Sequence, residues 1–454
     1  MENLGLKFNN LQKHMKKYLV ILWSMFMLCF CIGSCKDDPK TELPVEIASC
    51  ETHPQPGCPN YVDPEIPTLS AKITVGTTEY TVDSTHIEKI EDGFWYLYAQ
   101  LKNGNKPLII HSLRYTTSVS GYGIETWVGQ DSVSGKERPS AMVDRYERAG
   151  RQVKAAINGG FYNTAVGGTP MSLEVMNGVM TFPPSTDEPQ PVIGFDAQNR
   201  PYMDYVRMDA KVRDANNREL AFNSVNGTRW ADYLVLYNSY MGKHTKTNEW
   251  GTEVQCLPMT AQWEKLGSHL NVRCRIEKIE SMNGKGNMEI SGGNIVLSGN
   301  GAAHQYLRTL QVGDYVYVTV DYSLQSSPNI TSATIRNAVS GYNIILQRNS
   351  IIEPDPALIP DMPLVTSNHP RTSAGFSADS SHIFFTVVEG RRTGLAAGVS
   401  TKELAQVMKY LGAANAINLD GGGSSCLMIG KETKNYCTDG SQRAVANGIA
   451  IIKN

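Results

Sequence analysis

Alternating apolar and polar residues dominate the chain from residue 69 onward. Runs such as AKITVGTTEYTV, FWYLYAQL and KPLIIHSL repeat with a period of two, which is typical of half-buried β-strands. Between about residues 208 and 340 the strand-like runs continue, separated by Gly/Asn turns and with almost no helical spacing. We therefore predict a β-rich N-terminal region over residues 68–140 and a β-rich insertion over residues 208–340.

Two segments show the spacing of an amphipathic helix instead, one over residues 140–150 and one over residues 400–412. The second has the stronger boundary signals, because Ser400 and Glu403 have the spacing of a capping box and Gly412 is a stop signal. The apolar stripes consist of Met142, Val143, Tyr146 and Ala149 in the first segment and of Leu404, Val407, Met408 and Leu411 in the second.

The segments RTSAGFSA and HIFFTVVEG flank a turn at residues 379–381 and predict a β-hairpin. With the centre near the middle of this turn, Arg371 should lie opposite Glu389 to within one position. The second helix separates the hairpin from the apolar strand AINLD, which ends at Asp420. Strand, helix and strand in this order predict a right-handed crossover between parallel strands. Such strands would place Glu389 and Asp420 at the same sheet edge, where ligands bind.

These patterns predict an α+β (mixed α/β) fold class, with a central β-sheet, flanking helices and the β-rich insertion. The insertion interrupts a core that we assign to residues 141–207 and 341–454. A chain of 454 residues is long enough for a large core in one big domain or two smaller ones.

The N-terminus has the pattern of a bacterial lipoprotein signal over residues 1–35. A basic start at Met15 precedes the apolar run over residues 18–32, and small residues precede Cys35, the expected site of lipidation. The alternative, a transmembrane helix, is disfavoured because the run is shorter than the roughly 20 residues that a span needs. Residues 36–67 are rich in proline, and we predict that they form a tether between the lipid anchor and the folded domain. We expect an exported protein held at the cell envelope, at the outer membrane and on its surface, by lipid alone.

Six cysteines remain after the signal, and an even number in an exported protein favours disulfides, most economically between sequence neighbours. Free thiols are the alternative. The spacings do not resemble a zinc site. The six are Cys50, Cys58, Cys256, Cys274, Cys426 and Cys437.

Charge and histidine content restrict the chemistry further. The net charge of −2 does not suggest an electrostatic nucleic-acid partner, and we expect none. The nine histidines are scattered, without the clusters that a two-metal phosphodiesterase needs. No feature of the sequence therefore indicates a required cofactor, and the sequence does not identify a metal ion. A single Ca²⁺ bound by Asp420, carbonyl oxygens and Asn is the open alternative.

The stretch INLDGGGSS contains the clearest candidate for a binding loop. Its glycines, residues 421–423, allow backbone N–H groups to point at one anion, whereas the alternative is a tight turn that needs positive φ. Arg371 and Arg443 are fork donors suited to a phosphate, although either could be a surface ion-pair partner.

Glu389 and Asp420 could form the carboxylate pair that cleavage of a glycosidic bond requires. A structural interpretation remains open beside this one. In that case Glu389 would form a salt bridge with Arg371, and Asp420 would hold the glycine loop by hydrogen bonds.

Together these motifs resemble the phosphodiester glycosidase family. The matching stretches are AAINGGFYN (155–163), PRTSAGFS (370–377), the long block over residues 387–425, and RAVANGIAI (443–451). Their order and spacing match as well, so the resemblance covers roughly residues 140–454.

The resemblance implies a hydrolase that cleaves the bond between a sugar C1 and a phosphodiester oxygen, in a small-molecule or glycan substrate such as an N-acetylglucosamine-1-phosphodiester. Arginines and loop N–H groups would bind the phosphate, and one carboxylate would assist at C1. The implied residues are Asp420, Glu389 and Arg371 for catalysis and Asn158, Gly159, Gly160, Gly421, Gly422, Gly423, Ser424, Arg443 and Asn447 for substrate binding.

Two other functions remain open from the sequence. A non-catalytic glycan-binding lipoprotein should show an aromatic platform in an open cleft, and the tryptophans do not decide this. A metal-dependent phosphodiesterase would break the phosphorus–oxygen bond and would be inhibited by chelators.

Overall fold

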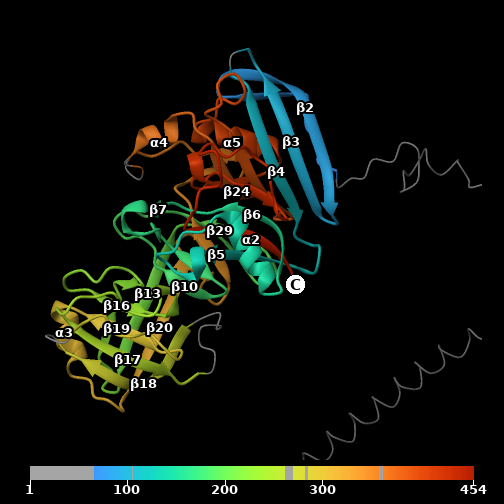
Figure 1. Cartoon of the computed structure of the whole chain (residues 1–454). Helices are drawn as coiled ribbons and strands as arrows, with labels where there is room; N and C mark the ends of the chain where they lie inside the picture. The colour runs from blue at the N-terminus through green and yellow to red at the C-terminus, as the bar shows by residue number, and fades with distance from the viewer. Residues whose placement is uncertain (1–65, 105, 261–268, 282–284, 357–358, 360) are drawn as a thin grey trace, which may run out of the picture. The chain divides into compact units, whose positions relative to one another are not determined.

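The computed structural model describes residues 66–454, apart from residues 105, 261–268, 282–284, 357–358 and 360 (Figure 1). The predicted signal, its Cys35 and nearly all of the predicted tether lie outside the described residues, as do Cys50 and Cys58. Within the described part, no helix combines the length and the apolar character needed to cross a membrane.

The largest sheet has nine strands and combines the N-terminal region with the predicted hairpin. All its pairings are antiparallel, and Figure 1 shows its strands β2, β3 and β4 side by side. The order across this sheet is β1 (Lys72–Val75), β2 (Thr78–Glu91), β3 (Phe94–Lys102), β4 (Leu108–Thr116), β25 (His382–Val388), β24 (Arg371–Phe376), β26 (Asn415–Asn418), β22 (Asn343–Gln347) and β23 (Ser350–Ile351).

The hairpin β24–β25 has the predicted register to within one position, because Arg371 lies opposite Val388. The prediction that the two parallel strands lie next to each other is wrong. β24 lies between β25 and β26 and is antiparallel to both, so β25 and β26 run parallel without pairing. The consequence for the site is nevertheless the expected one. β25 and β26 end, and β24 begins, at one edge of the sheet.

The helix α5 (Thr401–Tyr410) covers one face of this sheet. Its predicted capping box is present: the Ser400 hydroxyl accepts a hydrogen bond from the backbone N–H of Glu403, whose carboxylate accepts one from the backbone N–H of Ser400. The apolar stripe of α5 is buried against strand residues such as Leu97 and Phe384. This amphipathic face therefore ties the helix to the sheet.

The opposite face of the nine-stranded sheet packs on other strands. A buried cluster joins Phe385 and Ile417 of that sheet with Ile157 and Ile449 of a second sheet and with Ile193 of a third. The second sheet has the order β28 (Glu432–Thr433), β27 (Leu427–Ile429), β6 (Gln152–Asn158), β29 (Asn447–Lys453) and β5 (Tyr122–Val128), and the third β10 (Val179–Phe182), β9 (Glu174–Met176), β21 (Asn337–Ser340), β11 (Val192–Phe195) and β12 (Pro201–Asp204).

The helix predicted over residues 140–150 is confirmed as α2 (Pro139–Arg148). Met142, Val143 and Tyr146 are buried in a cluster with residues of the second sheet, and Gly150 follows the helix with a φ of 78°. The two-stranded ribbon β7 (Tyr162–Asn163) and β8 (Thr169–Pro170) leaves the core after β6.

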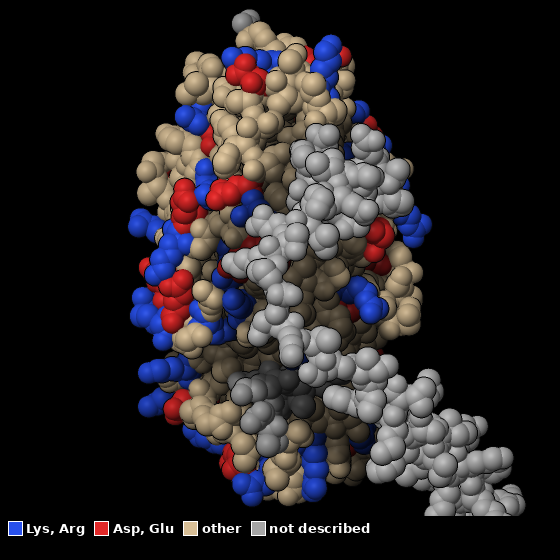
Figure 2. All heavy atoms as spheres, turned by 90° about the vertical axis from the view of Figure 1, so that its right-hand side faces the viewer, with Lys and Arg blue, Asp and Glu red and all other residues tan. Residues whose placement is uncertain are grey.

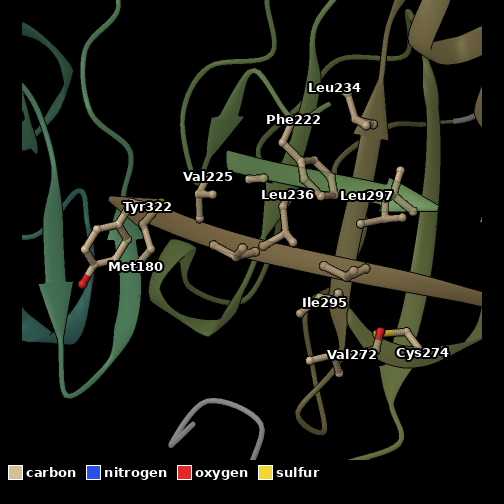
Figure 3. Close-up of a cluster of buried hydrophobic side chains, with 14 of the residues drawn as sticks. Met180, Phe222, Val225, Leu234, Leu236, Val272, Cys274, Ile295, Leu297 and Tyr322 are labelled. Carbon is tan, nitrogen blue, oxygen red and sulfur yellow. The ribbon is translucent and has the colours of Figure 1, made fainter. Parts of the chain in front are cut away.

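An eight-stranded sheet forms the β-rich insertion, with the helix α3 (Gly301–Leu307) against it. Its core contains Phe222, Leu236, Leu297 and Tyr322 (Figure 3). Its order is β14 (Glu219–Ala221), β13 (Val206–Asp214), β20 (Tyr315–Leu324), β18 (His269–Glu280), β17 (Thr252–Pro258), β19 (Ile295–Gly299), β16 (Leu234–Tyr237) and β15 (Ser224–Val225).

The predicted α+β fold class with flanking helices is wrong, because the structure is mostly β. The described residues contain four α-helices, of five to ten residues each, against sheets of up to nine strands. The physical reason is that sheet faces are covered mainly by other sheets. The strong helical signal of α5 correctly predicted one helix, but we extended it to an architecture that the other segments do not support.

The predicted disulfides are not formed by the described cysteines. Cys256, Cys274, Cys426 and Cys437 are all free thiols. In the β17–β18 pair, Cys274 lies opposite Pro258 rather than Cys256, so strand register separates those two.

Charged residues on the face shown in Figure 2 are interspersed rather than gathered in a patch of one sign. The whole chain has a net charge of −2, so neither sign predominates in its composition. Exposed pairs such as Lys72–Glu79 and Lys102–Asp83 contribute little stability, because solvent screens them.

Candidate active site

A cavity of about 250 Å³ lies at the sheet edge where β24 begins and β26 ends. The loops after β26 and β25, the residue just before β7 and the short helix α4 (Met362–Thr366) all contribute to it. Arginine is the most frequent charged residue among the side chains that line it, and Asp420 is the one carboxylate. The lining consists of Phe161, Leu364, His369, Arg371, Arg391, Asp420, Gly421, Gly422, Gly423 and Arg443.

The glycine loop allows other groups to come close. Side chains at these three positions would collide with the carbonyl oxygen of Pro370, with Arg391 and with Arg443, respectively, and Gly422 also has a φ of 61°. The N–H groups of Gly421 and Gly422 are already engaged, with the Asp420 carboxylate at 2.8 Å and the Pro370 carbonyl at 2.8 Å. The glycines thus make room for two arginines, a role that the predicted anion cradle did not include.

Arg371 is buried and donates to backbone carbonyls only. Its Nε bonds Val399 at 3.0 Å, and one terminal nitrogen bonds Leu364 and Ser367 at 2.7 and 2.8 Å. Burial, together with the neighbouring Arg391, lowers the pKa of Arg371 to about 10. In the part of the chain that the structure describes, no carboxylate forms an ion pair with it, so its charge is available to an anion in the cavity.

Arg391 and His369 are site residues that sequence reasoning missed. A terminal nitrogen of Arg391 donates to Nδ1 of His369 at 3.2 Å. Burial and the charges of Arg371 and Arg391 lower the pKa of His369, which keeps its ring neutral near pH 7. The one signal in the sequence was position, because Arg391 follows soon after the predicted strand HIFFTVVEG. The structure adds that Arg391 has an unusual φ of 57°.

Arg443 completes the group of three arginines in the cavity. Its Nε donates to Asp439 at 2.8 Å, and a terminal nitrogen lies 3.5 Å from the Ser424 hydroxyl. The ion pair with Asp439 raises the pKa of Arg443. Asp439 pairs with Arg443, whereas Arg371 and Arg391 form no ion pair with a carboxylate among the described residues.

Asp420 lies among these cations and is partly buried in the cavity wall. Burial raises the pKa of its carboxyl to about 6, although hydrogen bonds from Ser424 and from the Gly421 N–H, and the charge of Arg443, act in the opposite direction. Its backbone is fixed by Asn158 and Gly159, since its carbonyl accepts from the Asn158 amide at 2.6 Å and its N–H donates to Gly159 at 3.0 Å. A carboxyl group with this pKa can exchange a proton near neutral pH.

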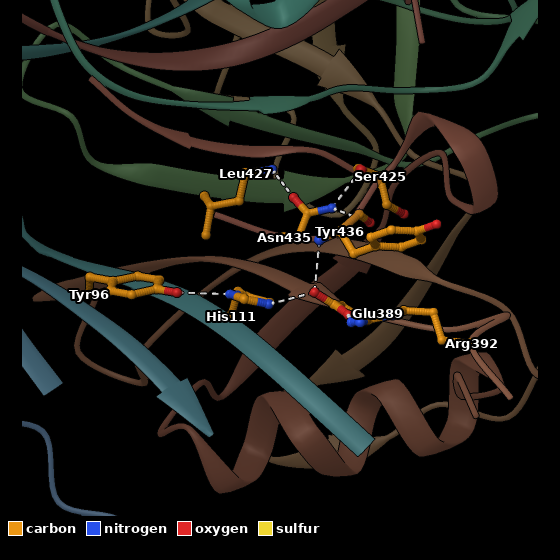
Figure 4. A network of polar contacts seen from close by, with 8 residues as sticks. All are labelled: Tyr96, His111, Glu389, Arg392, Ser425, Leu427, Asn435 and Tyr436. Atoms are coloured by element: carbon orange, nitrogen blue, oxygen red, sulfur yellow. Dashed lines mark hydrogen bonds and ion pairs between the residues drawn. The ribbon is translucent and has the colours of Figure 1, made fainter. Parts of the chain in front are cut away.

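Glu389 does not line this cavity. Its carboxylate accepts hydrogen bonds from His111 at 2.9 Å, from Arg392 at 2.6 Å and from the backbone N–H of Tyr436 at 2.8 Å (Figure 4). Burial would raise the pKa of Glu389, but these three donors lower it below its usual value. The salt bridge that we considered between Glu389 and Arg371 is absent, because Arg392 takes that place.

The remaining predicted binding residues lie behind the cavity wall. The Asn158 side chain accepts from Thr372 at 2.8 Å and from the Cys426 N–H at 3.0 Å, so it joins β6 to β24 and to the glycine loop. Asn447 donates to the buried Glu174 at 2.7 Å. Gly159 and Gly160 allow close packing, since added side chains would collide with Asn447 and with the Ser340 carbonyl, respectively.

Metal ligands do not gather at this site. The described residues contain no group of three or more His, Cys, Asp or Glu side chains that could hold a metal ion. A Ca²⁺ at Asp420 would share the cavity with three guanidinium groups. The prediction that no cofactor is required stays untested.

Comparison with known proteins supports the resemblance seen in the motifs. The model of the phosphodiester glycosidase family matches residues 271–452, which include the glycine loop and all three cavity arginines. This confirms the predicted family resemblance for that part of the chain, although the motif over residues 155–163 precedes the match. No curated protein matches the chain.

Two solved structures share the fold at low sequence identity, and a third shows a weaker similarity. A hypothetical protein from Synechocystis is 15% identical, with a TM-score of 0.63 over 82% of this chain and 64% of the other. A protein of Burkholderia pseudomallei K96243, predicted to be exported, is 20% identical, with a TM-score of 0.58 over 76% and 74%. The catalytic domain of zebrafish N-acetylglucosamine-1-phosphodiester alpha-N-acetylglucosaminidase, auto-inhibited by its pro-peptide, is 11% identical, with a TM-score of 0.40 over 82% and 88%.

Proposed function

We propose that this chain, whose residues 271–452 match the phosphodiester glycosidase family, hydrolyses the bond between a sugar C1 and a phosphodiester oxygen. The observation that carries the proposal is a small cavity lined by three arginines and by one partly buried carboxylate, Asp420. The arginines supply an anion site, and the carboxylate supplies a group that can act on the adjacent sugar carbon.

The phosphodiester binds between Arg371 and Arg391, neither of which forms an ion pair with a carboxylate in the described part of the chain. Arg371 is held in place by three carbonyl oxygens, so little reorganisation is needed when the anion arrives. Charge grows on the phosphate oxygen as the C1–oxygen bond breaks. The same guanidinium groups then stabilise the leaving phosphate monoester.

Asp420 acts on the sugar side of the bond. In its ionised form it stabilises positive charge at C1 or removes a proton from the attacking water. The water oxygen becomes the C1 hydroxyl, the phosphate leaves with the former bridging oxygen, and one water proton passes through the carboxylate to solvent. Because the pKa of Asp420 is about 6, this form prevails at pH 7.

Glu389 acts as a positioning residue in this scheme. It connects the end of β25 to the backbone of Tyr436, in the segment that leads to Asp439 and Arg443. The Glu389–Arg392 pair therefore supports the loop that supplies one cavity arginine, without contact with the substrate.

A screen of sugar-1-phosphate methyl esters tests the proposed activity. The described scheme predicts sugar release by the wild-type protein and at least about a hundredfold less by Asp420→Asn. Equal release by both proteins would identify a contaminant and refute the assignment.

We also propose that the protein is exported and anchored by lipid on Cys35. The support is the sequence pattern of residues 1–35. Metabolic labelling with radioactive palmitate should label the wild-type protein and not Cys35→Ser; label in both would contradict the anchor.

A further inference from the structure

Two hollows between the β-rich insertion and segments that precede it in the chain join into one groove. Their volumes are about 340 and 440 Å³, and both are lined by Thr169, Phe182, Gly227 and Thr228. We call their combined surface the insertion groove. It runs from the segment after β15 to the ribbon β7–β8 and lies apart from the lining of the arginine cavity.

The lining combines aromatic rings with neutral polar side chains and with four charged ones, Asp187, Glu188, Arg229 and Lys246. Trp230 is 63% exposed at the groove, and Tyr233 lies near it in the same hollow. A large exposed indole costs free energy in water, so its presence in a hollow points to a ligand with an apolar face. The neutral polar side chains in the lining include Asn163, Asn223, Thr228, Thr245, Thr247 and Asn248.

The groove is held in shape by contacts within the protein. The N–H of Trp230 donates to Thr228 at 3.1 Å, and the N–H of Tyr233 donates to Trp230 at 3.2 Å, which fixes the turn that presents the indole. Arg229 donates to Ser298 at 2.8 Å and to Asn248, and so braces the opposite wall. A preformed surface loses less entropy when a ligand binds.

We propose that the insertion groove binds an oligosaccharide chain, with Trp230 stacked on the C–H face of one pyranose ring. Each pyranose has such an apolar face and a rim of hydroxyl groups, and the groove offers an indole beside amide and hydroxyl side chains. A single phosphate group is disfavoured as the ligand, because the two cations of the lining already have partners: Arg229 donates to Ser298 and Asn248, and Lys246 donates to Ser134 at 3.1 Å.

The ribbon β7–β8 connects the groove to the arginine cavity. Asn163 lines the groove, while Phe161, two residues earlier, lines the cavity. The Phe161 ring packs against Tyr342 with centroids 4.9 Å apart, which gives the ribbon a fixed base. A glycan held in the groove is therefore retained close to the cavity, whatever reaction the cavity performs.

Affinity electrophoresis tests the proposal in native gels that contain one polysaccharide each, namely mannan, β-glucan, xylan, galactan or chondroitin sulfate. Wild-type protein should be retarded in at least one gel, and Trp230→Ala should raise the dissociation constant about tenfold. Trp250→Ala is the matched control, because Trp250 is 56% exposed in the same insertion but lines neither hollow.

Retardation lost in Trp230→Ala and kept in Trp250→Ala supports the groove. Retardation by none of the polysaccharides, or equal retardation of both variants, overturns it. Both substituted side chains are exposed, so the thermal midpoint should match that of the wild type, which separates lost binding from lost folding. Hydrolysis of a small sugar-1-phosphate ester should be unchanged in Trp230→Ala, so failure of the proposed activity would not affect this test.

Discussion

Glu389, which is buried, and Asp420, which is partly buried, are two carboxylates near one sheet edge, yet their surroundings differ in kind. Three donors from separate segments saturate Glu389 and lower the pKa of its carboxyl. Asp420 has fewer donors than its burial would require, and its pKa is raised to about 6. Saturation fixes a carboxylate as a structural group, whereas incomplete saturation leaves it able to react. The comparison assigns the chemistry to the cavity and the support to the Glu389 network.

Asp420→Asn should have the largest effect on activity, and it tests the contrast between Asp420 and Glu389 directly. We expect kcat on a sugar-1-phosphodiester to fall about a thousandfold, because the amide cannot accept a proton or stabilise positive charge. The thermal midpoint should not fall, since the substitution removes a charge that burial disfavours. Steady-state kinetics and calorimetry check both points. Retention of more than a tenth of the activity would contradict the role of Asp420.

Arg371→Lys should reduce kcat/KM about a hundredfold. Lysine keeps the charge but cannot bond several carbonyls and an anion together. Arg392→Lys is the control from the other region, because Arg392 contacts Glu389 rather than the cavity, and its kcat/KM should stay within about threefold of wild type. Equal losses in the two variants would break the distinction between the regions.

Glu389→Gln should act on stability rather than on chemistry. We expect the free energy of unfolding to fall by about 2 kcal/mol, because the partly exposed Arg392 and the buried His111 both lose a charged acceptor. The remaining folded protein should keep kcat within about threefold. Denaturant unfolding and active-site-normalised kinetics measure the two quantities. A large loss of kcat at unchanged stability would make Glu389 catalytic, as the family resemblance implied.

The two carboxylates should also give opposite pH dependences of stability. The folded-state pKa of Asp420 is raised, so the native state holds its proton more tightly and this group's contribution falls as pH rises through about 6. The folded-state pKa of Glu389 is lowered, so its contribution is present above the unfolded pKa and is lost as pH falls. Between pH 4 and pH 7, Asp420→Asn should therefore gain stability relative to wild type, while Glu389→Gln should lose it. Parallel trends would refute the contrast.

Local patterns predicted local features well. The α5 capping box and the β24–β25 register follow from residues close in sequence, and both are present. The glycine loop was likewise singled out by its own sequence, and it lines the cavity with Asp420.

Long-range partners could not be predicted in the same way. His111 reaches Glu389 because β4 pairs with β25, a contact between residues far apart in the chain. His369 and Arg391 enter the cavity from separate loops, and no periodicity marks them. The fold class was wrong for a related reason, since the covering of sheets by other sheets depends on which strands meet.

Hydrolysis of a sugar-1-phosphodiester in ¹⁸O-labelled water tests the central claim most directly. If the arginine cavity stabilises a departing phosphate while Asp420 assists at C1, mass spectrometry of the products will show the label in the sugar. Label in the phosphate would mean that the phosphorus–oxygen bond is cleaved, and would contradict the account.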